Sequence, residues 1–269
     1  MIDTEAAGRS AWLGESASWF AFGTAPTARG LATTERRPGL MCLWWLGDPH
    51  RLENNIWLED PRAAGEPGAA LGALGGRLAQ SAAATDLRLP VGPCLPAWAA
   101  AAARHGFEPA EEDPLMARDL HAPPASAPGG PPAAIRVRAA DAPADRALAL
   151  GVIVSVWGDP DVCRFFAPEG ASRLYLAEQG AAPAGAATTM RDGDGVRIFS
   201  VSTREDWRRQ GVARALLDGI ATAEAAAGVR WATLRTVDEL VPLYTAAGFE
   251  VVGRMARFRR PSGPHDPAP

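Results

Sequence analysis

The stretch from Val196 to Ala226, VRIFSVSTREDWRRQGVARALLDGIATAEAA, contains the change from strand to helix that decides the fold. Its first part is rich in residues that favour a strand, namely Val196, Ile198, Phe199 and Val201. Its last part repeats apolar residues at helical spacing, namely Val212, Leu216, Ile220 and Ala223. The sequence therefore predicts a strand, an arginine-rich turn and a helix, in that order.

The turn ends on two small residues just where the helix begins. It reads Arg208-Arg209-Gln210-Gly211-Val212-Ala213. Gly211 allows the backbone to approach a ligand closely, and the first turn of a helix has N–H groups without intrahelical partners. Together with the positive end of the helix dipole, these N–H groups form an anion site. We expect a phosphate group to bind there.

A second block, Leu243-Tyr244-Thr245-Ala246-Ala247-Gly248-Phe249, lies one strand and one short helix further along the chain. The pattern Arg208-x-x-Gly211-x-Ala213 followed by this block resembles the GNAT superfamily of acyl-CoA-dependent N-acetyltransferases. In that family the first pattern binds the pyrophosphate of the cofactor, and an LYxxxGF segment follows the next strand. The resemblance covers residues 135–260.

The resemblance implies a role for each residue of these motifs. The diphosphate is expected to contact Arg208, Arg209, Gln210, Gly211, Val212, Ala213 and Arg214, mostly through backbone N–H groups. The pantetheine is expected to lie along Val201 and Ser202, with the N–H of Thr203 facing the acetyl carbonyl. Tyr244 matches the tyrosine that protonates the leaving thiolate. The expected cosubstrate is acetyl-CoA, without a metal.

The general base is not determined by the sequence. Some members of the family carry Glu where this chain has Phe199, which cannot accept a proton. The alternatives are Glu178, Glu205, Asp206 and Asp238, and each is also a plausible surface carboxylate. Deprotonation through ordered water is a further alternative. The family often has Asn after the following strand, near the position where this chain has Val237.

The chain repeats the end of the second block in its first half. Ala103-Arg-His-Gly-Phe-Glu108 parallels Thr245-Ala-Ala-Gly-Phe-Glu250, 142 positions later. We therefore expect an α/β (α+β) fold of two tandem GNAT-like units, each a mixed, mostly antiparallel sheet flanked by helices. Acyl-CoA is expected in a cleft between splayed strands of the C-terminal unit. The first half lacks the phosphate loop and has Ala102 in place of Tyr244, so we expect it to bind no acyl-CoA.

The predicted organisation has four parts. These are a degenerate GNAT-like domain (1–121), a Pro/Gly/Ala linker (122–134), a catalytic domain (135–260) and a loose tail (261–269). Within the first part we expect a helix over residues 68–84. We also expect a polar break between Glu108 and Leu115.

Composition excludes several classes of protein. The formal net charge of -4 and the absence of a basic half argue against nucleic-acid binding. No apolar run is long enough to cross a membrane, and the first residues do not resemble a signal peptide. The three cysteines, Cys42, Cys94 and Cys163, form no CxxC pair, so we expect neither zinc nor disulfides and a cytoplasmic location.

The leading functional hypothesis is transfer of an acetyl group from acetyl-CoA to a small-molecule amine. Peptide or protein amines are the second acceptor class. A sensor or interaction module that binds acyl-CoA without turnover is the alternative of a different kind. We expect either a monomer, in which the two halves form a pseudo-dimer, or a homodimer.

Overall fold

A computed structural model describes residues 3–25, 32–46, 52–122, 135–167, 170 and 172–262 of the 269-residue chain. Two compact units are present, and each takes residues from both halves of the sequence. Unit 1 contains Met1–Ser18 and Pro114–Val252, whereas unit 2 contains Trp19–Asp113 and Gly253–Pro269. Apart from Ala122, the predicted linker lies outside the described residues, as does the predicted tail after Ser262.

Unit 1 contains a mixed sheet with helices on both faces. Its strands follow the order β5-β10-β9-β8-β7-β6. They are β5 (Glu108–Asp119), β6 (Ile135–Ala139), β7 (Arg173–Gln179), β8 (Ala182–Asp192), β9 (Gly195–Thr203) and β10 (Trp231–Arg235). The helices are the start of α1 (Thr4–Thr24), α6 (Pro143–Trp157), α7 (Pro160–Phe165), η2 (Glu205–Trp207), α8 (Val212–Ala226), η3 (Asp238–Leu240) and α9 (Val241–Ala246).

Unit 2 repeats this plan with shorter helices. Its strands follow the order β1-β2-β3-β4-β11. They are β1 (Ala32–Arg37), β2 (Leu40–Trp45), β3 (Asn54–Leu58), β4 (Thr85–Pro90) and β11 (Glu250–Arg260). Its helices are α2 (Pro61–Ala64), α3 (Pro67–Gly72), α4 (Gly75–Gln80) and α5 (Leu95–Arg104). Strands β3 and β4 pair in parallel, as do β9 and β10 in unit 1.

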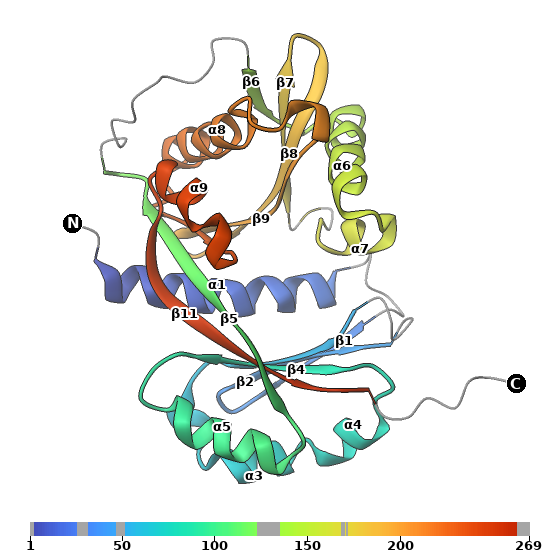
Figure 1. Ribbon diagram of the computed structural model, residues 1–269, viewed down its shortest axis with the longest axis vertical. Coiled ribbons are helices and arrows are strands. Elements are labelled where there is room, and N and C mark those ends of the chain that lie inside the picture. Colours follow the sequence, from blue (N-terminus) through green and yellow to red (C-terminus); the bar gives the residue numbers. More distant parts are fainter. Residues whose placement is uncertain are drawn as a thin grey trace, which may run out of the picture. The chain divides into compact units, whose positions relative to one another are not determined.

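Helices α8 and α6 lie on opposite faces of the strands β7 to β9 (Figure 1). Tyr175 and Ile198 belong to the core under α8, whereas Leu174 and Leu176 belong to the core under α6. The hydroxyl of Tyr175 donates to Glu224 of α8 at 2.7 Å, and Arg191 donates to the other oxygen of the same carboxylate at 2.6 Å. The alternation of side chains along each strand therefore assigns every residue of the sheet to one of two different surroundings.

The internal repeat found in the sequence has the same geometry in both copies. Gly106 and Gly248 each end a helix in the left-handed region, with φ of 78° and 82°. The N–H of Phe107 donates to Ala102 O, and that of Phe249 donates to Tyr244 O, both at 3.0 Å. The tandem relation between the halves therefore extends from sequence to backbone hydrogen bonding.

The strand that follows each of these helices joins the sheet of the other half of the sequence. Strand β5 pairs antiparallel with β10, and β11 pairs antiparallel with β4. The compact units therefore differ from the predicted parts 1–121 and 135–260, because residues 114–119 belong to unit 1 and residues 253–260 belong to unit 2. The predicted boundary at the linker divides the chain by sequence position. The compact units are instead defined by which strands pair with one another.

Three elements differ from the sequence predictions. The helix expected over residues 68–84 is divided into α3 and α4 at Ala73 and Leu74, which lie between Gly72 and Gly75, since glycine weakens a continuous helix. The expected polar break after Glu108 is absent, since β5 runs unbroken to Asp119. Strand β1 was not predicted, because its sequence ATTERR is polar; the edge position of this strand explains that composition.

Candidate functional site

Strands β9 and β10 pair only over their first residues. The parallel pairing joins Trp231 to Gly195, Ala232 to Val196 and Thr233 to Arg197, although β9 continues to Thr203. Beyond Arg197 the N–H and C=O groups of β9 that face β10 have no ladder partner on that strand. Such unpaired backbone groups can bind the amides of an extended ligand.

A β-bulge lies in β9 directly after the point of separation. Ala186 pairs with Ser202 and Thr188 with Phe199, so two residues of β9, Ser200 and Val201, oppose one of β8. Ser200 has φ of 48°, which is rare for a residue other than glycine. The bulge turns the end of β9, which contains Val201 and Ser202, predicted to lie along the pantetheine, and Thr203, predicted to face the acetyl carbonyl.

A buried ion pair that the sequence did not reveal lies where the two strands separate. Arg197 and Glu15 of α1 are both buried and in contact, and Arg235 Nε lies 3.2 Å from Glu15 Oε1. The ring of Phe199 lies 5.4 Å from the guanidinium of Arg197. No local pattern could identify this cluster, because Glu15 is more than a hundred residues away in sequence.

The loop between β9 and α8 has the backbone expected of an anion site. Gly211 is the N-cap of α8, with φ of 82° and no side-chain cap, and Arg209 also has positive φ, 61°. Backbones with left-handed residues turn successive N–H groups toward one point. The N–H groups at the start of α8 therefore have no side-chain cap that a phosphate would have to displace.

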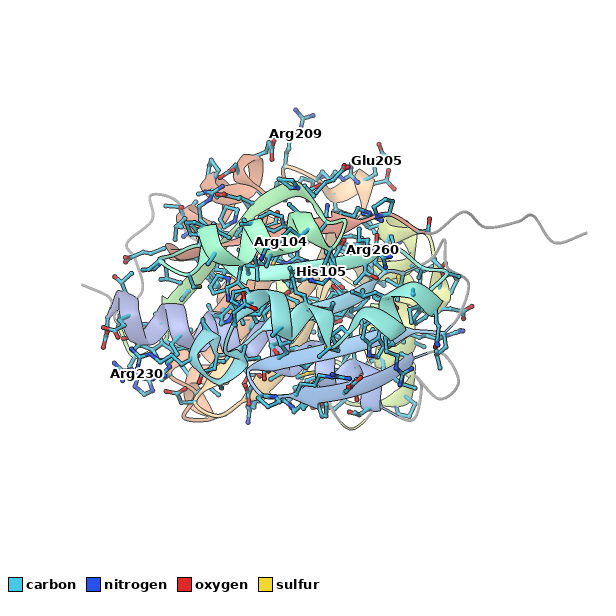
Figure 2. The ribbon with its side chains drawn as sticks, turned by 90° about the horizontal axis from the view of Figure 1, so that it is seen from below. Arg104, His105, Glu205, Arg209, Arg230 and Arg260 are labelled. Carbon is cyan, nitrogen blue, oxygen red and sulfur yellow. The ribbon has the colours of Figure 1, made fainter. Side chains whose placement is uncertain are left out.

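The arginines predicted to contact the diphosphate have different surroundings. Arg208 and Arg209 are exposed, and Figure 2 shows the side chain of Arg209 extending outward from the loop. Arg214 is half-buried, and its Nε lies 3.5 Å from Asp218, which also receives a 2.8 Å bond from Arg118. The two exposed guanidinium groups are thus the ones that can move onto a bound phosphate.

A glycine that the sequence analysis missed sets the position of this helix. A Cβ atom on Gly185 of β8 would lie 2.6 Å from Val212 Cγ1 and 3.0 Å from the carbonyl oxygen of Ser202. Val212 is the first residue of α8, and Ser202 lies on the predicted pantetheine strand. Only glycine at position 185 allows the helix N-terminus to lie this close to the sheet.

We expect Gly185→Ala to raise the dissociation constant for acetyl-CoA by about tenfold, since displacement of Val212 would move the N–H groups of the loop. The same overpacking should lower the free energy of unfolding by about 1–3 kcal/mol. Gly219→Ala is the matched control, because its Cβ would meet Val137 at 2.6 Å in the middle of the same helix. Calorimetric titration should show weaker binding for the first variant alone, and equal affinities would contradict this role of Gly185.

Tyr244 lies in α9 and is almost fully buried, with 7% of its surface exposed. Its ring packs edge to face on Phe249, with a centroid separation of 6.2 Å. Burial raises the pKa of Tyr244, against the opposing effect of a side-chain hydrogen bond with Thr236. Thr236 directly follows β10, so the phenol lies beside the strand that has separated from β9.

The structure brings none of the four predicted base candidates into a buried site that would favour proton uptake. The hydrogen bond from Arg138 holds the pKa of Glu178 below its usual range. Glu205 and Asp206 are exposed on η2, and Asp238 is exposed on η3. In the register of the sheet, Phe199 lies opposite Thr188, on the face that α6 covers.

The corresponding corner of unit 2 lacks both features of the site in unit 1. Strands β3 and β4 stay paired from Asn54 to Trp57, nearly the whole length of β3. The helix after β3 is capped by Asp60, which accepts from the N–H groups of Arg62 and Ala63. A carboxylate at this place satisfies the N–H groups and repels a phosphate, which supports the expectation that the first half binds no acyl-CoA.

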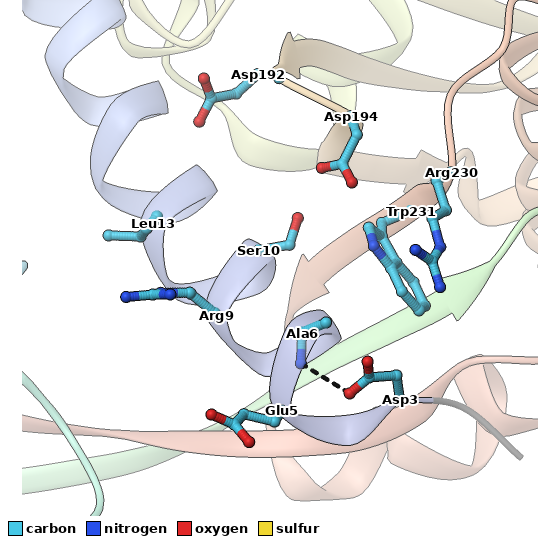
Figure 3. Close-up of a pocket in the computed structure, with 11 residues that line it drawn as sticks. Asp3, Glu5, Ala6, Arg9, Ser10, Leu13, Asp192, Asp194, Arg230 and Trp231 are labelled. Carbon is cyan, nitrogen blue, oxygen red and sulfur yellow. Dashed lines mark hydrogen bonds between the residues drawn. The ribbon is translucent and has the colours of Figure 1, made fainter.

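A separate cavity of about 500 Å³ lies at the other end of β9 and β10 (Figure 3). Its charged lining comprises Asp3, Glu5, Arg9, Asp192, Asp194 and Arg230. Because β9 begins there and has nine residues, the cavity is about 25 Å from Thr203. Within the described residues, no three His, Cys, Asp or Glu side chains are grouped as metal ligands. The distance from Thr203 makes this cavity distinct from the phosphate loop.

Comparisons with known proteins agree with this geometry. Residues 158–260 match a family model described as "Acetyltransferase (GNAT) domain". A GCN5-related N-acetyltransferase from Kribbella flavida superposes with a TM-score of 0.63 at 19% identity, covering 87% of this chain and 93% of that one. A GCN5-related N-acetyltransferase from Sphaerobacter thermophilus gives 0.59 at 16% identity, covering 94% of each chain.

A tandem GNAT protein from the clavulanic acid biosynthesis pathway gives a TM-score of 0.59 at 16% identity, covering 98% of this chain and 97% of that one. These likenesses establish the fold. No curated protein matches the chain in sequence. Residues 158–260 therefore match the GNAT acetyltransferase domain, as the sequence predicted, and the predicted tandem α/β fold is confirmed.

None of the helices in the described part of the chain is both long and apolar enough to cross a membrane.

Proposed function

We propose that the protein transfers an acetyl group from acetyl-CoA to a primary amine of a small molecule, without a metal. The observation that carries this proposal is the separation of β9 from β10 after Arg197, together with the uncapped start of α8, the next α-helix along the chain. In this proposal residues 208–214 hold the diphosphate. Residues 201–203 hold the pantetheine and the thioester carbonyl.

Each residue of the site has a defined task in this reaction. The N–H of Thr203 polarises the carbonyl, so that negative charge on its oxygen is stabilised when the amine attacks. The carbon–sulfur bond then breaks, and Tyr244 donates a proton to the sulfur. The raised pKa of Tyr244 keeps the phenol protonated and able to donate at neutral pH. The amine nitrogen loses one proton, which balances the proton gained by the thiol.

Two observations bear on the alternatives. Phe199 stands where a carboxylate could act as base, which favours a sensor that binds acyl-CoA without turnover. The phenol of Tyr244 beside β10 favours an enzyme. Peptide amines remain the second acceptor class. The described cysteines are all free, which suits a reducing compartment such as the cytoplasm.

Calorimetric titration with acetyl-CoA, followed by thiol release over a panel of amines and N-terminal peptides, tests the proposal. Binding with thiol release and an acetylated small amine identified by mass spectrometry supports it. Binding without release for any acceptor would establish the sensor instead. Turnover of peptides alone would move the proposal to the second acceptor class.

A further inference from the structure

Trp157, the last residue of α6, is the most exposed large apolar side chain among the described residues, at 62%. Its orientation is nevertheless fixed. The indole N–H donates to Ser202 Oγ at 3.0 Å, and that hydroxyl donates to the carbonyl oxygen of Ser200 at 2.9 Å. A rigid aromatic surface therefore stands against the predicted pantetheine strand, with most of its area available to a ligand.

The register of the sheet places Trp157 on the acceptor side of the site. Ser202 pairs with Ala186 and Phe199 with Thr188, so the bulge turns both Ser202 and Phe199 to the face that α6 covers. The phosphate loop leads into α8, which covers the opposite face of the sheet. An acyl-CoA held at α8, with its thioester carbonyl at the N–H of Thr203, would present its acyl group beside Ser202 and toward Trp157.

Three charged groups near this side, Asp159, Glu178 and Arg197, already have partners. Asp159, two residues after Trp157, accepts at 2.9 Å from the N–H of Asp161 at the start of α7. Glu178 is paired with Arg138, and the charged group over Phe199 is the guanidinium of Arg197. A strongly basic amine arrives protonated and must lose a proton before attack. These surroundings suit an amine that is already neutral.

We propose that the acceptor is an arylamine, a weakly basic amine on an aromatic ring that packs on Trp157. This inference rests on the proposed function. The neutral nitrogen attacks the thioester carbon with its own lone pair, and the carbon–sulfur bond breaks. One proton then passes from nitrogen to water while Tyr244 protonates the sulfur, giving an N-aryl acetamide and coenzyme A. No base is required before the attack.

Four test amines distinguish the effect of an aromatic ring on kcat/KM from the effect of basicity. They are p-anisidine (aromatic, weakly basic), 4-methoxybenzylamine (aromatic, strongly basic), methoxyamine (aliphatic, weakly basic) and cyclohexylmethylamine (aliphatic, strongly basic). Thiol release at neutral pH with saturating acetyl-CoA should give the highest kcat/KM for p-anisidine. A higher kcat/KM for either strongly basic amine would overturn this inference and leave the proposed function standing. If thiol is released neither with these four amines nor with any amine of the wider panel, both this inference and the proposed function fail.

Variants of α6 test the role of Trp157. Trp157→Ala should raise the KM for p-anisidine about tenfold and leave the affinity for acetyl-CoA unchanged, because the stacking surface is lost. Trp157→Phe should recover most of the loss, since it keeps an aromatic ring. Leu148→Ala is the control, because Leu148 is 45% exposed on the same helix. An unchanged KM in folded Trp157→Ala, or an equal rise in Leu148→Ala, would overturn the proposal.

Discussion

Replacing Gly211 by Asp is expected to abolish measurable binding of acetyl-CoA, with a loss of affinity of at least about a hundredfold. The new carboxylate would lie at the N-terminus of α8, where it would repel the diphosphate and could itself bond the N–H groups that the phosphate needs. The φ of 82° at this residue adds backbone strain for any side chain. Calorimetric titration of the folded variant measures the effect.

Two further variants distinguish the effects of the new charge, of the backbone strain and of the position along α8 on the affinity for acetyl-CoA. Asparagine tolerates a left-handed backbone better than most residues and carries no charge. Gly211→Asn should therefore retain more affinity for acetyl-CoA than Gly211→Asp. Gly228→Asp is the matched control, because Gly228 has φ of 81° just past the other end of α8 and is equally exposed. It should bind acetyl-CoA like the wild type. Full affinity in Gly211→Asp would remove the phosphate site from this corner.

Replacing Tyr244 by Phe is expected to lower kcat by about a hundredfold or more, while the affinity for acetyl-CoA stays within about twofold. The substitution removes the donor of the proton and keeps the packing on Phe249. The raised pKa of Tyr244 also has a consequence for the wild type. Because the phenol stays protonated to higher pH than an ordinary tyrosine, its ionisation should not reduce the rate below about pH 10.

The other tyrosine of the chain provides the control. Tyr175→Phe removes a buried hydroxyl that donates to Glu224 at 2.7 Å, so it should lower the free energy of unfolding by about 1–3 kcal/mol. It should leave kcat unchanged, because Tyr175 lies in the core between β7 and α8. A Tyr244→Phe enzyme with full kcat over the whole pH range would exclude Tyr244 as the acid.

Sequence reasoning was most successful where the relevant residues are adjacent in the chain. The loop from Arg208 to Ala213 joins a strand to a helix as expected, because close approach at Gly211 and free N–H groups at a helix start are local properties. The repeated helix ends at Gly106 and Gly248 were found for the same reason. The general base could not be predicted, since proton affinity depends on burial and on partners from other elements.

Residues that support the site from a distance were missed. Gly185 gives no signal in a strand of small residues, although a Cβ there would displace the start of α8. Glu15 lies in a helix that begins the chain, and its pairing with Arg197 joins segments separated by most of the sequence. The position of Trp157 was also missed, because its bond to Ser202 depends on the bulge in β9.

The sequence by itself determined the tandem α/β plan and the strand–turn–helix corner between Val196 and Ala226, because each depends on short runs of residues with fixed local geometry. Only the tertiary structure decided that β5 completes the sheet of unit 1 and β11 that of unit 2. The two strands follow nearly identical helix ends, so their local sequences give no preference for either sheet. The choice between sheets depends on pairing with strands remote in the chain, and pairing of this kind is settled by the packing of the whole fold.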